Sequence, residues 1–236
     1  MMSNSDLTSH DVSVVIPAYN AGPFIDAAIE SIVTQDSPPD EIIVVDDGSS
    51  DDTAQRCAKW GDRVLLIRQA QHGVGRARNV GVDAATGRLL AFLDADDLWM
   101  PEKLTLQVAH LNAHASHVAV FGWMQNFIHP GAAITPDART PMNARPAFQA
   151  PTMLARREVF ASIGRFDEEG PLQGWVDWYL RLIESGLPLG MVDTLCLRRR
   201  IHGANMTLTT PGVSTGYHRL IHASLQRRRA RSGEER

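Results

Sequence analysis

The sequence predicts an α/β fold, a mostly parallel sheet flanked by helices, and three observations carry that prediction. Short apolar runs alternate with segments of helical spacing, and the connections between them are short. Three of the apolar runs end abruptly in polar clusters, at PAYN (17–20), DDGSSDD (46–52) and DADD (94–97). If these strands are parallel, the clusters meet on one rim of the sheet, where ligands of open α/β folds bind.

Strand–helix units fill the first half of the chain. Buried strands are expected at residues 12–16, 41–45 and 89–93, and a further strand at 63–68. Helices should follow the turn at 20–23, run from Asp51 or Asp52 through Lys59, follow the Gly73–Gly75 loop, and begin near Pro101. In the third of these helices, Gly81 should allow close packing against the sheet.

The second half has fewer motifs, but its elements can still be predicted. The expected elements are a strand at 118–123, a Pro/Gly-rich loop at 127–145, a strand and helix within 153–166, a helix at 172–184 and a closing helix at 215–229. The apolar stripe of the closing helix should pack on the domain itself or on a second subunit of a homodimer.

Length and composition limit the class of protein. The chain has 236 residues and a formal net charge of −4, which suits one α/β domain without nucleic-acid binding. Cys57 and Cys196 are far apart and the N-terminus lacks an apolar core, so a cytoplasmic protein without a signal peptide or membrane span is expected. The tail at 227–236, which begins with the basic run RRRAR, is interpreted as a solvated terminus, with peripheral contact to anionic lipid as the alternative.

The DADD cluster is the strongest single indication of a site. It follows the buried strand at 89–93 and places three carboxylates side by side. Like charges at this spacing repel one another unless a cation or a hydrogen-bonded ligand shares their charge. The alternative is a solvated strand-to-helix turn in which Asp97 caps the next helix. The loop at 73–75, followed by Arg76 and Arg78, would add a phosphate-binding edge, although neither a GxGxxG nor a P-loop pattern is present.

A second group of candidate ligands is the histidine series His110, His114 and His117, which falls on one face of a predicted helix. Its spacing resembles that of a metal site, but no carboxylate completes the set. We interpret the series as a solvated histidine face, with a metal site as the alternative.

Five segments, in this order and spacing, resemble the family 2 glycosyltransferases. They are VVIPAYNAGPFI, EIIVVDDGSSDDT, ARNVGVDAATGRLLAFLDADDLWMPEKL, VFASIGRFDEE and DWYLRL. The resemblance runs from about Val12 to Asn205 and implies the GT-A fold, a Rossmann-like nucleotide-sugar-binding domain with a DxD metal motif. It implies residues 1–110 as the nucleotide-sugar-binding half, 111–212 as the acceptor-side half, and 213–236 as a C-terminal helix and basic tail. The 127–145 loop would border the acceptor side.

The resemblance also implies site residues. Those for nucleotide binding are Pro17, Ala18, Tyr19, Asn20, Asp46, Asp47, Arg78, Asp94, Ala95 and Asp96. Asp47 would hold the base, and Asp96 would be the ligand of Mn²⁺ or Mg²⁺. A divalent cation that bridges phosphates prefers carboxylate oxygens. His202 lies in RIHGAN, similar to a late RxHxxN segment of the family, and could reach the metal or the diphosphate.

The chain departs from the family pattern at the predicted catalytic helix. Gly174 and Trp175 stand where the family has an acidic Glu-Asp pair, so Asp177, which should face the same cleft as Asp96, becomes the candidate general base. Trp175, Trp178 and Tyr179 could stack on a sugar, although aromatic residues at this spacing are more often helix core. Arg181 could pair with Asp177 or Glu184.

The predicted function is therefore an inverting glycosyltransferase. It would move a sugar from a nucleoside-diphosphate sugar, with UDP as the expected nucleotide, to a hydroxyl of a glycan, a lipid-linked acceptor or a small molecule. The first alternative is a nucleotide-sugar-binding protein that has lost its chemistry, since the acidic pair is missing. A nucleotidyltransferase is the second, and the first strand end lacks the glycine-rich signature that it would require.

Overall fold

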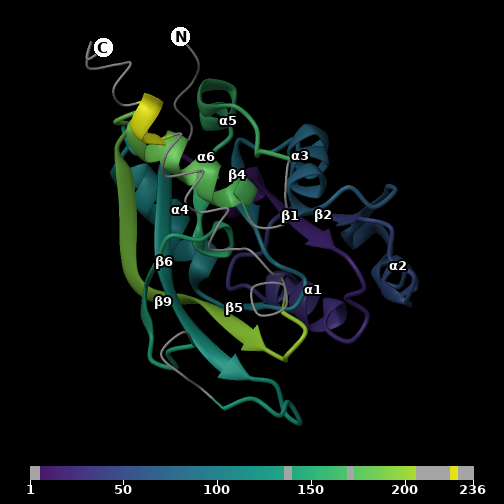
Figure 1. Cartoon of the computed structure of the whole chain (residues 1–236). Helices are drawn as coiled ribbons and strands as arrows, with labels where there is room; N and C mark the ends of the chain where they lie inside the picture. The colour runs from purple at the N-terminus through teal and green to yellow at the C-terminus, as the bar shows by residue number, and fades with distance from the viewer. Residues whose placement is uncertain (1–5, 136–139, 169–172, 206–223, 228–236) are drawn as a thin grey trace.

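The computed structural model describes residues 6–135, 140–168, 173–205 and 224–227. Its strands form one nine-stranded sheet in the order β3-β2-β1-β4-β8-β6-β9-β5, with β7 paired to β6 (Figure 1). The strands are β1 Val12–Ala18, β2 Glu41–Asp46, β3 Leu65–Arg68, β4 Leu89–Phe92, β5 Leu98–Trp99, β6 Ala119–Ile128, β7 Arg145–Ala147, β8 Leu154–Arg156 and β9 Leu189–Ile201.

The first half of the sheet is parallel, as predicted. β1 pairs with β2 and β4, and β2 pairs with β3, all in parallel. β1, β2 and β4 are buried on both faces apart from Glu41, which explains why they read as continuous apolar runs. Their carboxyl ends therefore share one rim.

The second half of the sheet is mixed. β8 runs antiparallel to β4 and β6, whereas β9 runs parallel to β6. Four strands differ from the prediction: β6 continues to Ile128, into the expected loop, while the short strands β5 and β7 and the 13-residue strand β9 were not predicted. Only part of β9 is buried, and it carries three consecutive arginines, so it lacks the apolar run that marks the parallel strands.

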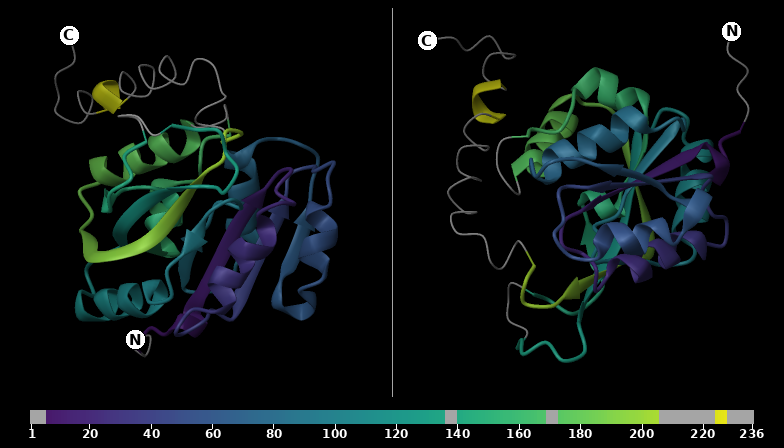
Figure 2. Two further views of the ribbon diagram at one scale, coloured as in Figure 1. Left: turned by 90° about the horizontal axis from the view of Figure 1, so that it is seen from below. Right: turned by 90° about the vertical axis from the view of Figure 1, so that its right-hand side faces the viewer.

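Helices cover both faces of the sheet (Figure 2). They are α1 Ile25–Val33, α2 Thr53–Ala58, α3 Val74–Ala84, α4 Lys103–Ala113, α5 Glu158–Ile163 and α6 Gln173–Glu184, with short 3-10 turns at Ser9–Asp11, Gly61–Arg63 and Ala150–Thr152. One core cluster holds the buried side chains of α1, α2 and α4, and a second holds those of α3, α5 and α6. Along β1, Val14 and Ile16 belong to the first cluster and Val15 to the second, because successive strand side chains point to opposite faces.

Gly81 confirms the predicted close packing of α3 on the sheet. A Cβ atom at this position would overlap the side chain of Val15 on β1. The helix therefore lies nearer to the sheet than any larger residue would allow, and its first turn is brought toward the rim.

Two predictions are not tested by the described residues. The closing helix at 215–229 lies mostly outside them, although residues 224–227 are helical. One sheet includes strands from both sides of residue 110, so the division into two halves stays a prediction.

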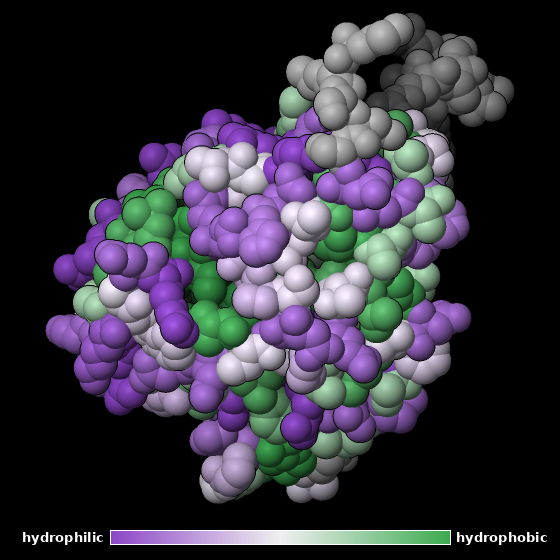
Figure 3. Space-filling view, turned by 180° about the vertical axis from the view of Figure 1, so that it is seen from behind, coloured by the Kyte–Doolittle hydropathy of each residue, from purple (hydrophilic) through white to green (hydrophobic). Residues whose placement is uncertain are grey.

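Within the described part of the chain, no helix is both long and apolar enough to span a membrane. The face opposite to that of Figure 1 shows apolar side chains in separate patches among polar ones (Figure 3).

Candidate functional site

The three polar clusters meet on the rim, as predicted. The backbone N–H of Asp47 donates to the carbonyl of Ala18 at 2.8 Å, and the side chain of Asn20 accepts a hydrogen bond from the backbone N–H of Ser50 at 2.9 Å. The third cluster adjoins the first because β4 pairs with β1, and the N–H of Leu93 continues that pairing. Strand order alone thus brings together segments that are about 30 to 75 residues apart.

Asp46 and Asp47 are both buried, and their carboxylates shape the surrounding loops. Asp46 accepts hydrogen bonds from Ser49 N and Arg68 Nε. Asp47 accepts from Gln69 Nε2 at 2.6 Å, from His72 N at 2.9 Å and from Gly73 N at 2.7 Å. A carboxylate has about four lone-pair sites, so Asp47 retains roughly one for a ligand. In this structure it holds the loop that leads into α3.

The first cluster, PAYN at 17–20, contains an exposed aromatic ring next to the buried end of β1. Pro17 and Ala18 are buried at the end of β1, whereas Tyr19 is 47% exposed. Asn20 has φ +48°, a left-handed backbone that costs energy in a residue other than glycine. Its backbone N–H and its side chain both bond to the second cluster, at Ser49 and Ser50. This strained turn leaves the Tyr19 ring open to a ligand.

A buried arginine adjoins the DADD cluster. Arg78 of α3 is 7% exposed, and its guanidinium donates to Asp94 Oδ1 at 2.8 Å. Its Nε is buried and has no hydrogen-bond partner among the described residues. A buried donor without a partner costs free energy, so this arginine fits an anionic ligand at the rim.

Asp96 meets the end of β9. His202 Nε2 lies 2.9 Å from Asp96 Oδ2, and Asn205 Nδ2 donates to the same oxygen at 3.1 Å. The side chains of Asp96 and His202 are 28% and 11% exposed. A carboxylate oxygen and an imidazole nitrogen this close suit a divalent cation such as Mn²⁺, so the predicted metal pair fits the geometry.

Asp97 and Arg200 join the DADD cluster to the end of β9. The sequence analysis predicted this structural role for neither residue. The buried carboxylate of Asp97 accepts the backbone N–H of Arg200 at 2.8 Å, and Arg200 Nε donates to the carbonyl of Asp96. Burial, together with Asp96 and Asp94 nearby, raises the pKa of Asp97 well above its ordinary value. The guanidinium of Arg200 and the ring of His202 both lie against the Phe24 ring. The RIHGAN segment was the signal that could have identified Arg200 and Asn205.

With this geometry established, comparison with known proteins identifies the family. The family model described as "Glycosyl transferase family 2" matches residues 13–164. The chain belongs to glycosyl transferase family 2. The matched range covers the rim clusters and Arg78, whereas the predicted site residues Asp177 and His202 lie outside it.

Two curated proteins that are similar to this chain are a chondroitin synthase and a glucosyltransferase. Chondroitin synthase of Escherichia coli is 28% identical over 225 residues, which are 92% of this chain and 33% of that protein. UDP-Glc:alpha-D-GlcNAc-diphosphoundecaprenol beta-1,3-glucosyltransferase WfgD of Escherichia coli is 40% identical over 100 residues, 42% of this chain and 40% of that protein. The chain spans 30–40% of the length of the first curated relatives that it matches.

Solved structures show the same fold. S. aureus TarS in complex with UDP-GlcNAc superposes with a TM-score of 0.72 at 20% identity, over 90% of this chain and 65% of that one. The mannosyltransferase PcManGT from Pyrobaculum calidifontis, in complex with GDP-Man and Mn²⁺, gives a TM-score of 0.63 at 20% identity over 83% and 57% of the two chains. This family 2 chain therefore has the predicted GT-A fold, with a sheet that is parallel in its first half and mixed in its second.

Asp177 is not placed as the sequence analysis expected. Its carboxylate was expected to face Asp96, but its described partners are Arg181 Nε at 2.8 Å and Arg227 Nη1 at 3.5 Å. Arg181 in turn donates to the carbonyls of Ile163 and Arg165. Asp177 thus lies in the packing between α6 and residues 224–227, and its catalytic role stays a prediction. Arg227, which was assigned to a solvated basic run, is ion-paired with α6 instead.

The aromatic residues of α6 are mostly core, as the alternative predicted. Trp178 is fully buried and stacks on Phe160 at 4.7 Å between ring centroids. Trp175 and Tyr179 are partly buried, and the indole N–H of Trp175 donates to the carbonyl of Phe148. A Cβ atom at Gly174 would collide with the backbone of Asp167. An acidic residue at Gly174 would therefore displace the backbone at Asp167.

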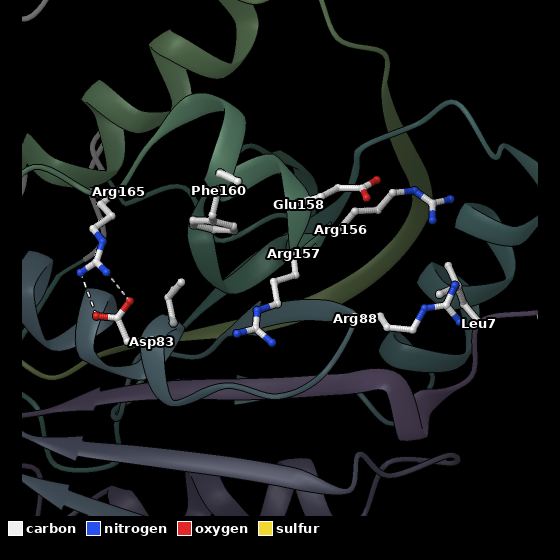
Figure 4. Close-up of a pocket in the computed structure, with 10 residues that line it drawn as sticks. Leu7, Asp83, Arg88, Arg156, Arg157, Glu158, Phe160 and Arg165 are labelled. Atoms are coloured by element: carbon white, nitrogen blue, oxygen red, sulfur yellow. Dashed lines mark hydrogen bonds and ion pairs between the residues drawn. The ribbon is translucent and has the colours of Figure 1, made fainter. Parts of the chain in front are cut away.

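An arginine-lined cavity of about 670 Å³ lies at the opposite end of the strands (Figure 4). Arg88 immediately precedes β4, and Arg156 ends β8, which runs antiparallel to it. Arg165 pairs with Asp83 at one side, and Arg157 extends between Asp83 and Arg88. Because β4 begins here and ends at the rim, this cavity is separate from the family 2 site.

Proposed function

We propose that the chain binds a nucleoside-diphosphate sugar on the rim and transfers its sugar to an acceptor hydroxyl with inversion. The meeting of Asp96, His202 and Asn205 beside the Arg78–Asp94 pair is the observation that carries this proposal. It places possible ligands of a divalent cation next to a buried guanidinium, whose Nε has no hydrogen-bond partner among the described residues. A diphosphate and its cation present complementary charges to these groups.

UDP is the nucleotide that we propose, with Asp47 and the exposed Tyr19 ring on the side of the base. The names of WfgD and of the TarS complex both contain a UDP-sugar, although PcManGT is in complex with GDP-Man. A stacked ring tolerates any base, whereas a buried carboxylate selects a base that donates N–H groups. The remaining lone pair of Asp47 would supply that selection.

In the proposed transfer, an acceptor oxygen attacks the anomeric carbon from the face opposite the diphosphate. The new carbon–oxygen bond forms as the bond to the diphosphate oxygen breaks, and the acceptor proton passes to a carboxylate base. Asp96 and His202 would hold Mn²⁺ or Mg²⁺, which neutralises the charge that develops on the departing diphosphate. Arg78 would hold the same group from the side of α3.

A second candidate function is nucleotide-sugar binding without transfer. It is favoured by Gly174 and Trp175, which lack the acidic groups of the family pair, and by the two arginines that engage Asp177. Hydrolysis or transfer from a UDP-sugar would exclude this function, whereas binding without turnover would support it.

Three related assignments are proposals as well. The acceptor is proposed to be a glycan, a lipid-linked sugar or a small molecule, and a homodimer is a candidate assembly. A cytoplasmic location is proposed from the two cysteines, both of which are free and buried.

Asp96→Ala is the variant that tests the proposal. UDP with Mn²⁺ should raise the melting temperature of the wild type, since a ligand at 100 times its Kd adds about 2.7 kcal/mol to the free energy of unfolding. Asp96→Ala and the isosteric Asp96→Asn should lose the Mn²⁺-dependent part of that shift. Asp62→Ala is the matched control, because Asp62 is an exposed acid in the turn before β3, at the opposite end of the parallel strands from the rim. An unchanged Mn²⁺ dependence in both Asp96 variants would show that the metal assignment is wrong.

A further inference from the structure

Three histidines gather where α4 ends. His110 lies in its last turn, His114 caps it, and His117 precedes β6. One ring nitrogen from each lies within 4.8 Å of the others. His110 Nε2 and His117 Nδ1 are 3.0 Å apart, and the His114 ring stacks on both neighbours. The interpretation as a solvated face holds only for His114, since His110 and His117 are half-buried.

Backbone contacts hold this cluster in place. Gly190 of β9 lies beneath it, and a Cβ atom there would overlap the His110 ring and come within 2.9 Å of His117 Nδ1. The N–H of Val118 donates to the carbonyl of Pro188, and Arg156 Nε donates to the carbonyl of His117. The turn that carries His117 is therefore tied to the start of β9 and to β8. The bare backbone of Gly190 provides the space that the two rings occupy.

The hydrogen bonds of the three rings are compatible with metal binding. His114 Nδ1 lies 3.0 Å from the carbonyl of His110, so it donates there and leaves the lone pair of Nε2 free. The facing nitrogens of His110 and His117 are joined by a single hydrogen bond when both rings are neutral. A metal ion could replace the proton between them, and its binding would release that proton.

We propose that His110, His114 and His117 bind one zinc-type dication that links the end of α4 to the turn before β6. Three imidazoles suit Zn²⁺, Cu²⁺ or Ni²⁺, and Zn²⁺ accepts three nitrogens at ~2.0–2.1 Å with water in the fourth position. Tetrahedral bonds of that length place the nitrogens about 3.3 Å apart. The exposed ring of His114 can rotate, which would bring its nitrogen closer to the nitrogens of His110 and His117. The site is distinct from Asp96 and does not depend on glycosyl transfer.

Calorimetric titration with Zn²⁺ after removal of metal by a chelator tests this proposal. His114→Gln removes the exposed ligand, and His10→Gln is the matched control because His10 is an exposed histidine elsewhere on the surface. An Asp96→Ala background separates this site from the rim, and absorption of bound Co²⁺ reports tetrahedral geometry. Gly190→Ala, which intrudes on both half-buried rings, is the second variant.

The wild type should bind one Zn²⁺ with tetrahedral Co²⁺ absorption, and Asp96→Ala should retain this binding. His114→Gln and Gly190→Ala should each weaken it by at least about tenfold, a typical loss when a metal site is disturbed, while His10→Gln should not. Zinc binding that disappears with Asp96→Ala would overturn the proposal. Equal affinities of the wild type and His114→Gln would overturn it as well.

Discussion

Asp177→Asn distinguishes a catalytic role from a structural one. The carboxylate of Asp177 bonds to Arg181 at 2.8 Å and to Arg227 at 3.5 Å, so it links α6 to residues 224–227. Arg181 also donates to the carbonyls of Ile163 and Arg165, where α5 ends. Asparagine keeps the size of the side chain but removes the charge that holds both guanidinium groups. The structure therefore predicts a loss of stability.

The magnitude follows from burial. The side chains of Asp177 and Arg181 are 16% and 22% exposed. An exposed ion pair contributes about 0–1 kcal/mol, and breaking a fully buried one costs about 3–5 kcal/mol. This pair lies between those limits, so Asp177→Asn should lower the free energy of unfolding by about 1–2 kcal/mol. For a chain of this size that is a fall of about 2–8 °C in Tm.

Urea and thermal unfolding measure the loss, with Asp193→Asn as the control because Asp193 is exposed on β9. A double-mutant cycle with Arg181→Met should show a coupling of about 0.5–2 kcal/mol, since the two residues are in contact. Donor turnover per folded molecule, measured well below Tm, should stay within a few-fold of the wild type. A positioned base contributes ~10²–10⁴-fold in rate. A turnover loss of that size with unchanged stability would refute this reasoning and establish Asp177 as the base.

Two further variants test buried ionisable groups. Asp47→Ala should weaken UDP binding by about 1–3 kcal/mol, the cost of an unpaired buried polar group, and equal affinities would exclude its role in base recognition. Lys103 is fully buried against the Trp99 ring, and burial lowers its pKa from 10.5 to about 7. The unfolded chain therefore binds more protons than the folded one between these values, and stability should rise with pH there. Lys103→Met should abolish this contribution, so that its stability relative to the wild type falls by about 2 kcal/mol from about pH 7 to 9; a pH-independent difference would contradict the assignment.

Local pattern was sufficient for the parallel half of the fold. β1, β2 and β4 are buried on both faces, so their sequences are continuous apolar runs that end where the chain leaves the sheet. Because parallel strands present their carboxyl ends on one side, the meeting of the three polar clusters could also be inferred from sequence. The close packing at Gly81 was predictable for a similar reason, since small residues within a helix mark a near approach.

Contacts between distant segments were decided only by the tertiary structure. His202 reaches Asp96 across 106 residues because β9 runs parallel to β6 and carries its last residues to the rim. β9 itself escaped prediction, since a partly exposed strand with three arginines lacks an apolar run. Asp177 pairs with Arg181 of its own helix, as sequence spacing allowed, but its second partner Arg227 comes from a segment 50 residues away. Periodicity places a side chain on one face of its own helix or strand, whereas its partner depends on strand order and helix packing, which arise from the whole chain.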